Sequence, residues 1–133
     1  MAEIAHRFVD TNGIRMHIAE TGPADGPLVV LCHGFPESWY SWRHQIPALA
    51  DAGFHVIAPN LRGYDTSSKP PSVRDYTIDR LAQDVFELIQ RKCDGVANVV
   101  GHDWGGGIAW HLAMEHPDCI ERLAILNAPH PLA

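Results

Sequence analysis

The chain has 133 residues, of which 46% are hydrophobic and 20% are charged, so it fits one compact domain and excludes two domains, disorder or a collagen-like repeat. Sixteen acidic residues against ten basic ones give a net charge of −6, which disfavours nucleic acid as a partner. The first residues form no apolar leader, and no uncharged apolar run approaches the ~20 residues of a membrane helix, so we expect a cytoplasmic protein without a membrane partner.

Strand and helix patterns alternate along the sequence. The predicted strands lie at about residues 5–9, 14–20, 28–32, 55–58, 97–100 and 122–126. The first two flank Asn12-Gly13, which is a strong hairpin signal. The run at 28–32 is apolar without alternation, which is typical of a strand buried on both faces of a sheet. This order predicts an α/β fold with a mostly parallel sheet, whose ligands bind at the carboxyl ends of the strands.

Apolar side chains at helical spacing predict three helices. They span about residues 39–51, 78–92 and 105–115. Pro47 is expected to kink or shorten the first, Thr77 to cap the second, and Pro117 to end the third. The segment 59–76 between the first two is long, polar and proline-bearing, which is typical of a functional loop.

The three cysteines indicate no covalent framework. Cys32, Cys93 and Cys119 are odd in number, widely spaced and form no C-x-x-C pair, which argues against disulfides and against a zinc site. We interpret them as small buried apolar side chains.

Residues 101–106, Gly-His-Asp-Trp-Gly-Gly, stand where a predicted strand ends and a helix begins. Gly101, Asp103 and Gly105 have the Gly-x-nucleophile-x-Gly spacing of a nucleophile elbow, in which one strained residue is exposed between strand and helix. A dinucleotide fingerprint would need Gly at position 103, and a phosphate loop would need Lys at position 107. The remaining alternative is that Asp103 simply caps the helix, since Asp is a preferred N-cap.

An Asp at the nucleophile position points to particular chemistry. A carboxylate is ionised at neutral pH and attacks without a general base, whereas Ser needs a neighbouring His. Attack on an ester or amide would produce a high-energy anhydride, but attack on a saturated carbon that bears a leaving group produces an ordinary ester. Epoxides and alkyl halides are such substrates. Hydrolysis of that ester by water then passes through an oxyanion, which needs hydrogen-bond donors.

Residues 33–37, His-Gly-Phe-Pro-Glu, follow the strand at 28–32 and offer such a donor. Gly34 permits a tight turn that points the N–H of Phe35 into the pocket, with the N–H of Trp104 as its partner. An ordinary strand-to-helix turn is the alternative for this string alone. Together, the two loops lie where an α/β-hydrolase needs its oxyanion hole and its nucleophile.

From the first hairpin to the last residue, the chain resembles the N-terminal half of an epoxide hydrolase of the α/β-hydrolase superfamily. The motifs that carry the resemblance are His-Gly-Phe-Pro-Glu-Ser-Trp-Tyr-Ser-Trp-Arg at 33–43, Arg-Gly-Tyr-Asp-Thr-Ser at 62–67, residues 101–106, and Asn-Ala-Pro-His-Pro at 127–131. The resemblance implies an α/β-hydrolase-type sheet that stops after about the sixth strand, with residues 1–133 forming the N-terminal part of one domain.

The resemblance also implies a site and a reaction. Asp103 is the expected nucleophile, and the backbone N–H groups of Phe35 and Trp104 are the expected oxyanion hole. The expected supporting residues are His33, Gly34, Pro36, Gly101, His102 and Gly105. The loop 62–67 is expected to brace the site, although Asp65 stands where the family commonly has a second glycine. The expected partners are a small epoxide and water, the product is a vicinal diol, and no metal or organic cofactor is implied.

Two other functions stay open. Haloalkane dehalogenases share the Asp-Trp pair, but they usually carry a polar or indole side chain where this chain has Phe35, which favours the epoxide. A non-catalytic α/β module that associates with itself or with a complementary half is the third hypothesis. Asp103 itself disfavours a serine esterase.

Several parts of the family's machinery are expected outside these 133 residues. They are the cap tyrosines, the relay acid and the water-activating histidine, which follows the nucleophile in a later loop. Asn127 stands where some relatives place the acid. We interpret His111, His116 and His130 as structural histidines. If the sheet ends at its sixth strand, the exposed parallel edge predicts self-association.

Overall fold

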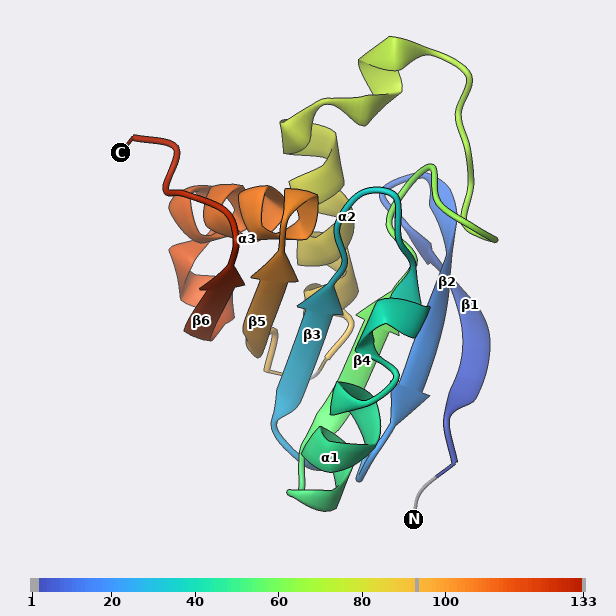
Figure 1. The fold of residues 1–133 in the computed structure, drawn as a ribbon, viewed down its shortest axis with the longest axis vertical. Coiled ribbons are helices and arrows are strands. Elements are labelled where there is room, and N and C mark those ends of the chain that lie inside the picture. The colour runs from blue at the N-terminus through green and yellow to red at the C-terminus, as the bar shows by residue number, and fades with distance from the viewer. Residues whose placement is uncertain (1–2, 93, 133) are drawn as a thin grey trace.

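A computed structural model describes residues 3–92 and 94–132 and shows a six-stranded sheet with helices on both faces (Figure 1). The strands are β1 (Ala5–Thr11), β2 (Ile14–Thr21), β3 (Leu28–Cys32), β4 (His55–Pro59), β5 (Ala97–His102) and β6 (Ile120–Leu126). They lie in the order β1-β2-β4-β3-β5-β6, with β1/β2 and β2/β4 antiparallel and the other pairs parallel. The predicted mostly parallel α/β sheet with its N-terminal hairpin is confirmed.

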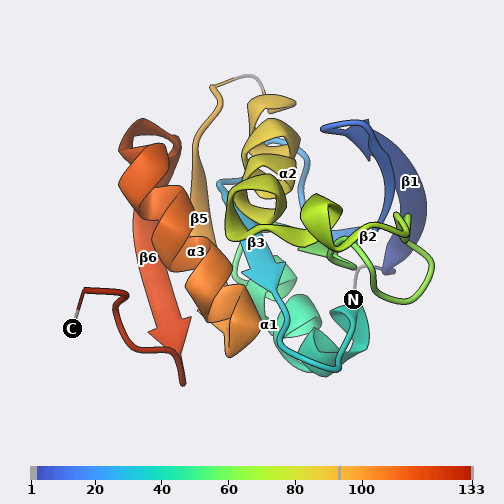
Figure 2. The same ribbon diagram turned by 90° about the horizontal axis from the view of Figure 1, so that it is seen from above.

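Helices cover the two faces of this sheet unequally. The α-helices are α1 (Gln45–Asp51), α2 (Ile78–Gln90) and α3 (Trp104–Glu115), and 3-10 helices span η1 (Trp39–Trp42), η2 (Val73–Tyr76) and η3 (Pro117–Cys119). The helix α1 lies on one face, whereas α2 and α3 lie on the other (Figure 2). Strand β3 packs into both layers, with Val30 on the α2/α3 side and Leu31 on the α1 side. Burial on both faces is why the run at 28–32 does not alternate.

The prediction of a single helix over 39–51 is wrong. The structure has η1, then Arg43 and His44, and then α1. Pro47 does not cause the break, because it lies in the first turn of α1, where a backbone N–H has no intrahelical acceptor to lose. Ser38 caps η1 separately, since its hydroxyl accepts a hydrogen bond from the Tyr40 N–H.

Most other boundaries follow the sequence patterns. Thr77 is the N-cap of α2, and its hydroxyl accepts from the Arg80 N–H. The helix α3 ends at Glu115, before Pro117, as predicted. The long segment 59–76 contains one element that the patterns missed, the 3-10 helix η2.

Two of the three cysteines lie within the described residues, and both are buried and free, as predicted. Burial raises the pKa of the Cys32 thiol to about 12. Cys93 lies outside the described residues. Nowhere in the described part does a helix have both the length and the apolar character needed to cross a membrane.

Candidate active site

Asp103 lies between β5 and α3 in a backbone conformation that few residues other than glycine adopt, with φ 58° and ψ −122°. Its N–H donates to the Leu126 carbonyl at 3.0 Å, and its carbonyl accepts from the Gly107 N–H at 3.1 Å. These bonds tie the turn to the end of β6 and to the first turn of α3. The strained conformation is therefore held from both sides, as a nucleophile elbow requires.

Glycines allow the strand, the helix and the neighbouring loop to approach one another around Asp103. A Cβ on Gly105 would lie 2.2 Å from the Cys32 carbonyl oxygen, and a Cβ on Gly101 would lie 2.4 Å from the Gly105 carbonyl oxygen. Any side chain at these positions would push α3 away from β3 or β5. The Gly-x-Asp-x-Gly spacing is thus a packing requirement of this turn.

The Asp103 carboxylate is stabilised by neighbouring backbone N–H groups. The Phe35 N–H donates to Asp103 Oδ2 at 3.2 Å. The Trp104 N–H and then the Phe35 N–H lower the pKa of Asp103, and His102 adds a smaller effect in the same direction. Gly34 makes this approach possible, because a Cβ there would lie 2.6 Å from the Asp103 Cβ. The structure therefore brings together the three residues that the sequence pattern singled out.

His33 and Pro36 shape the loop that presents Phe35. The buried His33 ring accepts the Leu61 N–H at Nε2, at 3.0 Å, so its proton is on Nδ1 and donates to the Gly34 carbonyl at 2.9 Å. Burial lowers the pKa of His33, which keeps the ring neutral. Pro36 follows Phe35 through a cis peptide bond. His33 thus connects this loop to the one that follows β4.

Glu37 joins the two loops of the site, a role that sequence reasoning missed. Its Oε1 accepts from the Gly34 N–H at 2.9 Å and lies 3.5 Å from His102 Nδ1. With the Gly34 N–H occupied by Glu37, the next N–H along the chain, that of Phe35, is directed at Asp103. The only sequence signal for this role was the place of Glu37 directly after Pro36.

A cavity of about 330 Å³ lies beside these loops. It is lined by His33, Phe35, Leu61, Arg62, Tyr64, Tyr76, Leu81, Trp104 and Ile108. Tyr64 and Tyr76 come from the segment 59–76. Tyr64 belongs to the motif at 62–67 that was expected to brace the site, whereas no motif included Tyr76. Burial, and then the charge of Asp103, raises the pKa of Tyr64. The cavity offers a mostly apolar chamber next to a carboxylate.

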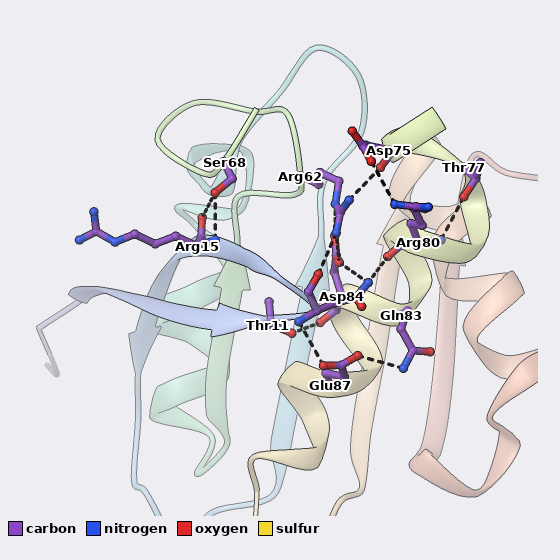
Figure 3. A network of polar contacts seen from close by, with 11 residues as sticks. Thr11, Arg15, Arg62, Ser68, Asp75, Thr77, Arg80, Gln83, Asp84 and Glu87 are labelled. Carbon is purple, nitrogen blue, oxygen red and sulfur yellow. Dashed lines mark hydrogen bonds and ion pairs between the residues drawn. The ribbon is translucent and has the colours of Figure 1, made fainter. Parts of the chain in front are cut away.

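A buried ion pair holds the loop after β4 against the rest of the molecule (Figure 3). The Arg62 guanidinium donates to both oxygens of Asp84 in α2, at 2.9 and 2.8 Å, and the two side chains are only 4% and 1% exposed. It also donates to the carbonyls of Asp75 and Asn12. Asp65 occupies the left-handed region with φ 48°, which Asp tolerates better than most residues.

The later histidines lie elsewhere. His111 Nε2 is 2.6 Å from Asp79 Oδ1, the His116 ring stacks on Phe86, and the His130 ring packs edge-on against Trp110. Among the described residues, no histidine hydrogen-bonds to the Asp103 carboxylate.

Comparison with known proteins places this geometry in a family. The family model of the α/β hydrolase fold matches residues 27–133. The chain belongs to the α/β hydrolase fold family. The α/β hydrolase superfamily protein YfhM of Bacillus subtilis is 54% identical over 125 residues, which cover 94% of this chain and 44% of that protein.

Two further relatives of this α/β hydrolase chain are epoxide hydrolases. Epoxide hydrolase A of Mycobacterium tuberculosis is 47% identical over 129 residues, which cover 97% of this chain and 40% of that protein. The crystal structure of epoxide hydrolase VrEH1 from Vigna radiata matches with a TM-score of 0.92 at 46% identity, over 96% of this chain and 39% of that one. The chain therefore spans less than half the length of these relatives.

Proposed function

We propose that this chain carries the alkylating centre of an epoxide hydrolase. A carboxylate oxygen of Asp103 attacks a ring carbon of the epoxide, a new C–O ester bond forms, the ring C–O bond breaks, and the released alkoxide takes a proton from water. The Asp103 Oδ2 atom, held by the Phe35 N–H at 3.2 Å, then becomes the carbonyl oxygen of the ester. The observation that carries the proposal is the Phe35 N–H bond to the carboxylate of Asp103, which stands in a strained elbow conformation directly before the first residue of α3, Trp104.

The same donors suit the second step. When water attacks the ester, the carbonyl oxygen becomes an oxyanion, and the N–H groups of Phe35 and Trp104 stabilise it without moving. We do not assign the activation of that water to any of the described residues. We propose instead that residues 1–133 are the N-terminal part of a single α/β-hydrolase domain and complete the first half-reaction only. His33, Gly34, Pro36, Gly101, His102 and Gly105 support the geometry.

Intact-mass spectrometry tests the first half-reaction. The 133-residue chain is incubated with styrene oxide beside the Asp103→Asn variant, whose side chain is similar in size but uncharged. We expect an adduct of substrate mass on the parent chain alone, and fragmentation should place it on Asp103. A folded parent chain without an adduct would overturn the proposal in favour of a non-catalytic module.

A haloalkane substrate separates the second candidate. The Trp104 indole next to Asp103 is compatible with a dehalogenase as well, whereas the apolar Phe35 side chain supplies no second halide donor. Halide release from a bromoalkane that outpaces alkylation by styrene oxide would support the dehalogenase. We expect the reverse.

We propose a small epoxide and water as the partners, a cytoplasmic location in keeping with the free thiols of Cys32 and Cys119, and self-association through β6. In the described structure β6 is an edge strand, and a groove of about 550 Å³ lies beside it, lined mainly by apolar side chains such as Leu123 and Ala124. Light scattering should show Ala124→Lys shifted toward the monomer relative to Ala48→Lys on α1. A parent chain that is monomeric throughout would refute the association.

A further inference from the structure

Two histidines and an asparagine form a connected group outside the Asp103 centre. His6 in β1 and His17 in β2 lie diagonally across the hairpin, since His17 pairs with Phe8 in the sheet register. The His17 residue is only 8% exposed, and Asn60, directly after β4, is completely buried. The mechanism above uses none of these three side chains.

The orientation of the Asn60 amide is fixed by a backbone donor. Its Oδ1 accepts the Trp39 N–H at 2.8 Å, so its Nδ2 is the atom that faces His17 Nδ1, at 2.7 Å. An amide nitrogen only donates hydrogen bonds. His17 Nδ1 must therefore be an unprotonated acceptor.

This assignment decides the state of the second histidine too. His17 carries its proton on Nε2, which lies 3.0 Å from His6 Nδ1. His6 Nδ1 is then the acceptor, and the hydrogen bonds run in one direction, from Asn60 to His17 to His6. An additional proton has no compatible position, because on His17 Nδ1 it would face the Asn60 amide and on His6 Nδ1 it would face the His17 N–H.

Burial and the surrounding charges favour a neutral His17. Burial, and then the neighbouring His6, lowers the pKa of His17, against an upward pull from Asp65. The Arg15 guanidinium lies 3.9 Å above the ring of Phe8, which packs against His17. The Lys69 ammonium donates a hydrogen bond to the Asp65 carbonyl. Around the histidines, the two cations Arg15 and Lys69 thus outnumber the single carboxylate of Asp65.

The same asparagine connects the histidines to both loops of the site. The Trp39 N–H that it binds opens η1, shortly after the loop of Phe35. The backbone carbonyl of Asn60 accepts the Ser67 hydroxyl at 2.6 Å, and the Ser67 hydroxyl oxygen in turn accepts the backbone N–H of His17 at 2.9 Å. The next residue, Leu61, donates its N–H to His33. Loss of the hydrogen bonds of Asn60 would thus affect the loops on both sides of the candidate active site.

We propose that Asn60 is a positioning residue that locks His17 and His6 in one neutral tautomeric state, and that protonation of this pair breaks the lock and loosens residues 60–68 and the start of η1. The device makes the candidate site sensitive to acid. Its effect on alkylation rests on the proposed function, whereas the protonation states do not.

Long-range 1H–15N correlation spectra of the imidazoles of the full chain, from about pH 8 to about pH 5, test the lock. We expect His17 as the Nε2–H tautomer, with a titration midpoint below the ~6.5 of free histidine. In Asn60→Asp, a carboxylate accepts where the amide donated, so His17 should become protonated at Nδ1 and its midpoint should rise by about one to three units.

A second variant keeps the test decisive if Asn60→Asp does not fold. His6→Ala, at an exposed position, removes the neighbouring imidazole that helps to lower the pKa of His17, so the midpoint should rise while the Nε2–H tautomer stays. An Nδ1–H tautomer of His17 in the parent chain would overturn the proposal, as would midpoints that neither variant moves.

The pH profile of alkylation separates positioning from a purely structural role. Asp103 stays ionised throughout this range, because backbone N–H groups lower its pKa from an already acidic value. The parent rate should fall several-fold between about pH 7 and about pH 5, whereas Asn60→Asp, which accommodates a protonated His17, should keep a level rate. Parallel profiles would refute the coupling. Normal titrations without any adduct would refute the proposed function alone.

Discussion

The elbow at Asp103 and the loop after β4 both border the candidate site, but different contacts hold them in place. Around the elbow, backbone atoms touch directly, and the important positions are those without a side chain, such as Gly105. The loop after β4 is held by charged side chains from distant segments, above all the Arg62–Asp84 pair. The backbone packing at the elbow can be recognised in the sequence as a motif of six residues. The ion pair joins residues 62 and 84, which are distant in the sequence and form no such motif.

The largest effect is expected from breaking the buried ion pair. Arg62→Met leaves the Asp84 carboxylate buried without its partner, and we expect the free energy of unfolding to fall by about 3–5 kcal/mol. The matched control is Arg80→Met, since Arg80 pairs with Asp75 at the surface of the same network (Figure 3) and should cost no more than about 1 kcal/mol. Equal urea midpoints for the two variants would show that burial does not distinguish these pairs.

A smaller loss is expected at the elbow. Gly105→Ala places a methyl group against two backbone carbonyls that cannot rotate away, and we expect a loss of about 2–3 kcal/mol together with slower alkylation. Gly107→Ala, two residues along the same helix, meets no atom within 4 Å and should stabilise the chain by about 0.5–1 kcal/mol. Urea unfolding measures both, and a neutral Gly105→Ala would contradict the close approach described above.

The smallest effect is a loss of stability in mild acid. Burial lowers the pKa of His17 and of His33, so the unfolded chain binds protons more readily, and stability falls as the pH drops below about 6.5. Urea midpoints at about pH 7.5, 6 and 5 should decrease in that order. Asn60→Asp should flatten the decrease, because it raises the pKa of His17 toward that of the unfolded chain. If the urea midpoint falls with pH equally in the parent chain and in Asn60→Asp, His17 is not the origin of this loss.

These contrasts show which parts of the fold were predictable. The strands and the helices α2 and α3 were predictable because their apolar spacing and their caps are local. The prediction of a single helix over 39–51 was wrong because a 3-10 helix, which buries Trp42, and a short α-helix share one run of apolar side chains. Pro47 was misjudged for the same reason, since its effect depends on where the helix begins.

The sequence by itself determined the α/β order of elements and the identity of the residue at the elbow, because both depend on short-range spacing. Only the tertiary structure decided how Glu37 bridges Gly34 and His102, which tyrosines line the cavity, and which way the amide of Asn60 faces. Each of these depends on atoms that the sheet order brings together from distant segments. Hydrogen-bond direction in particular follows from three-dimensional partners, since the same Asn donates or accepts according to what surrounds it.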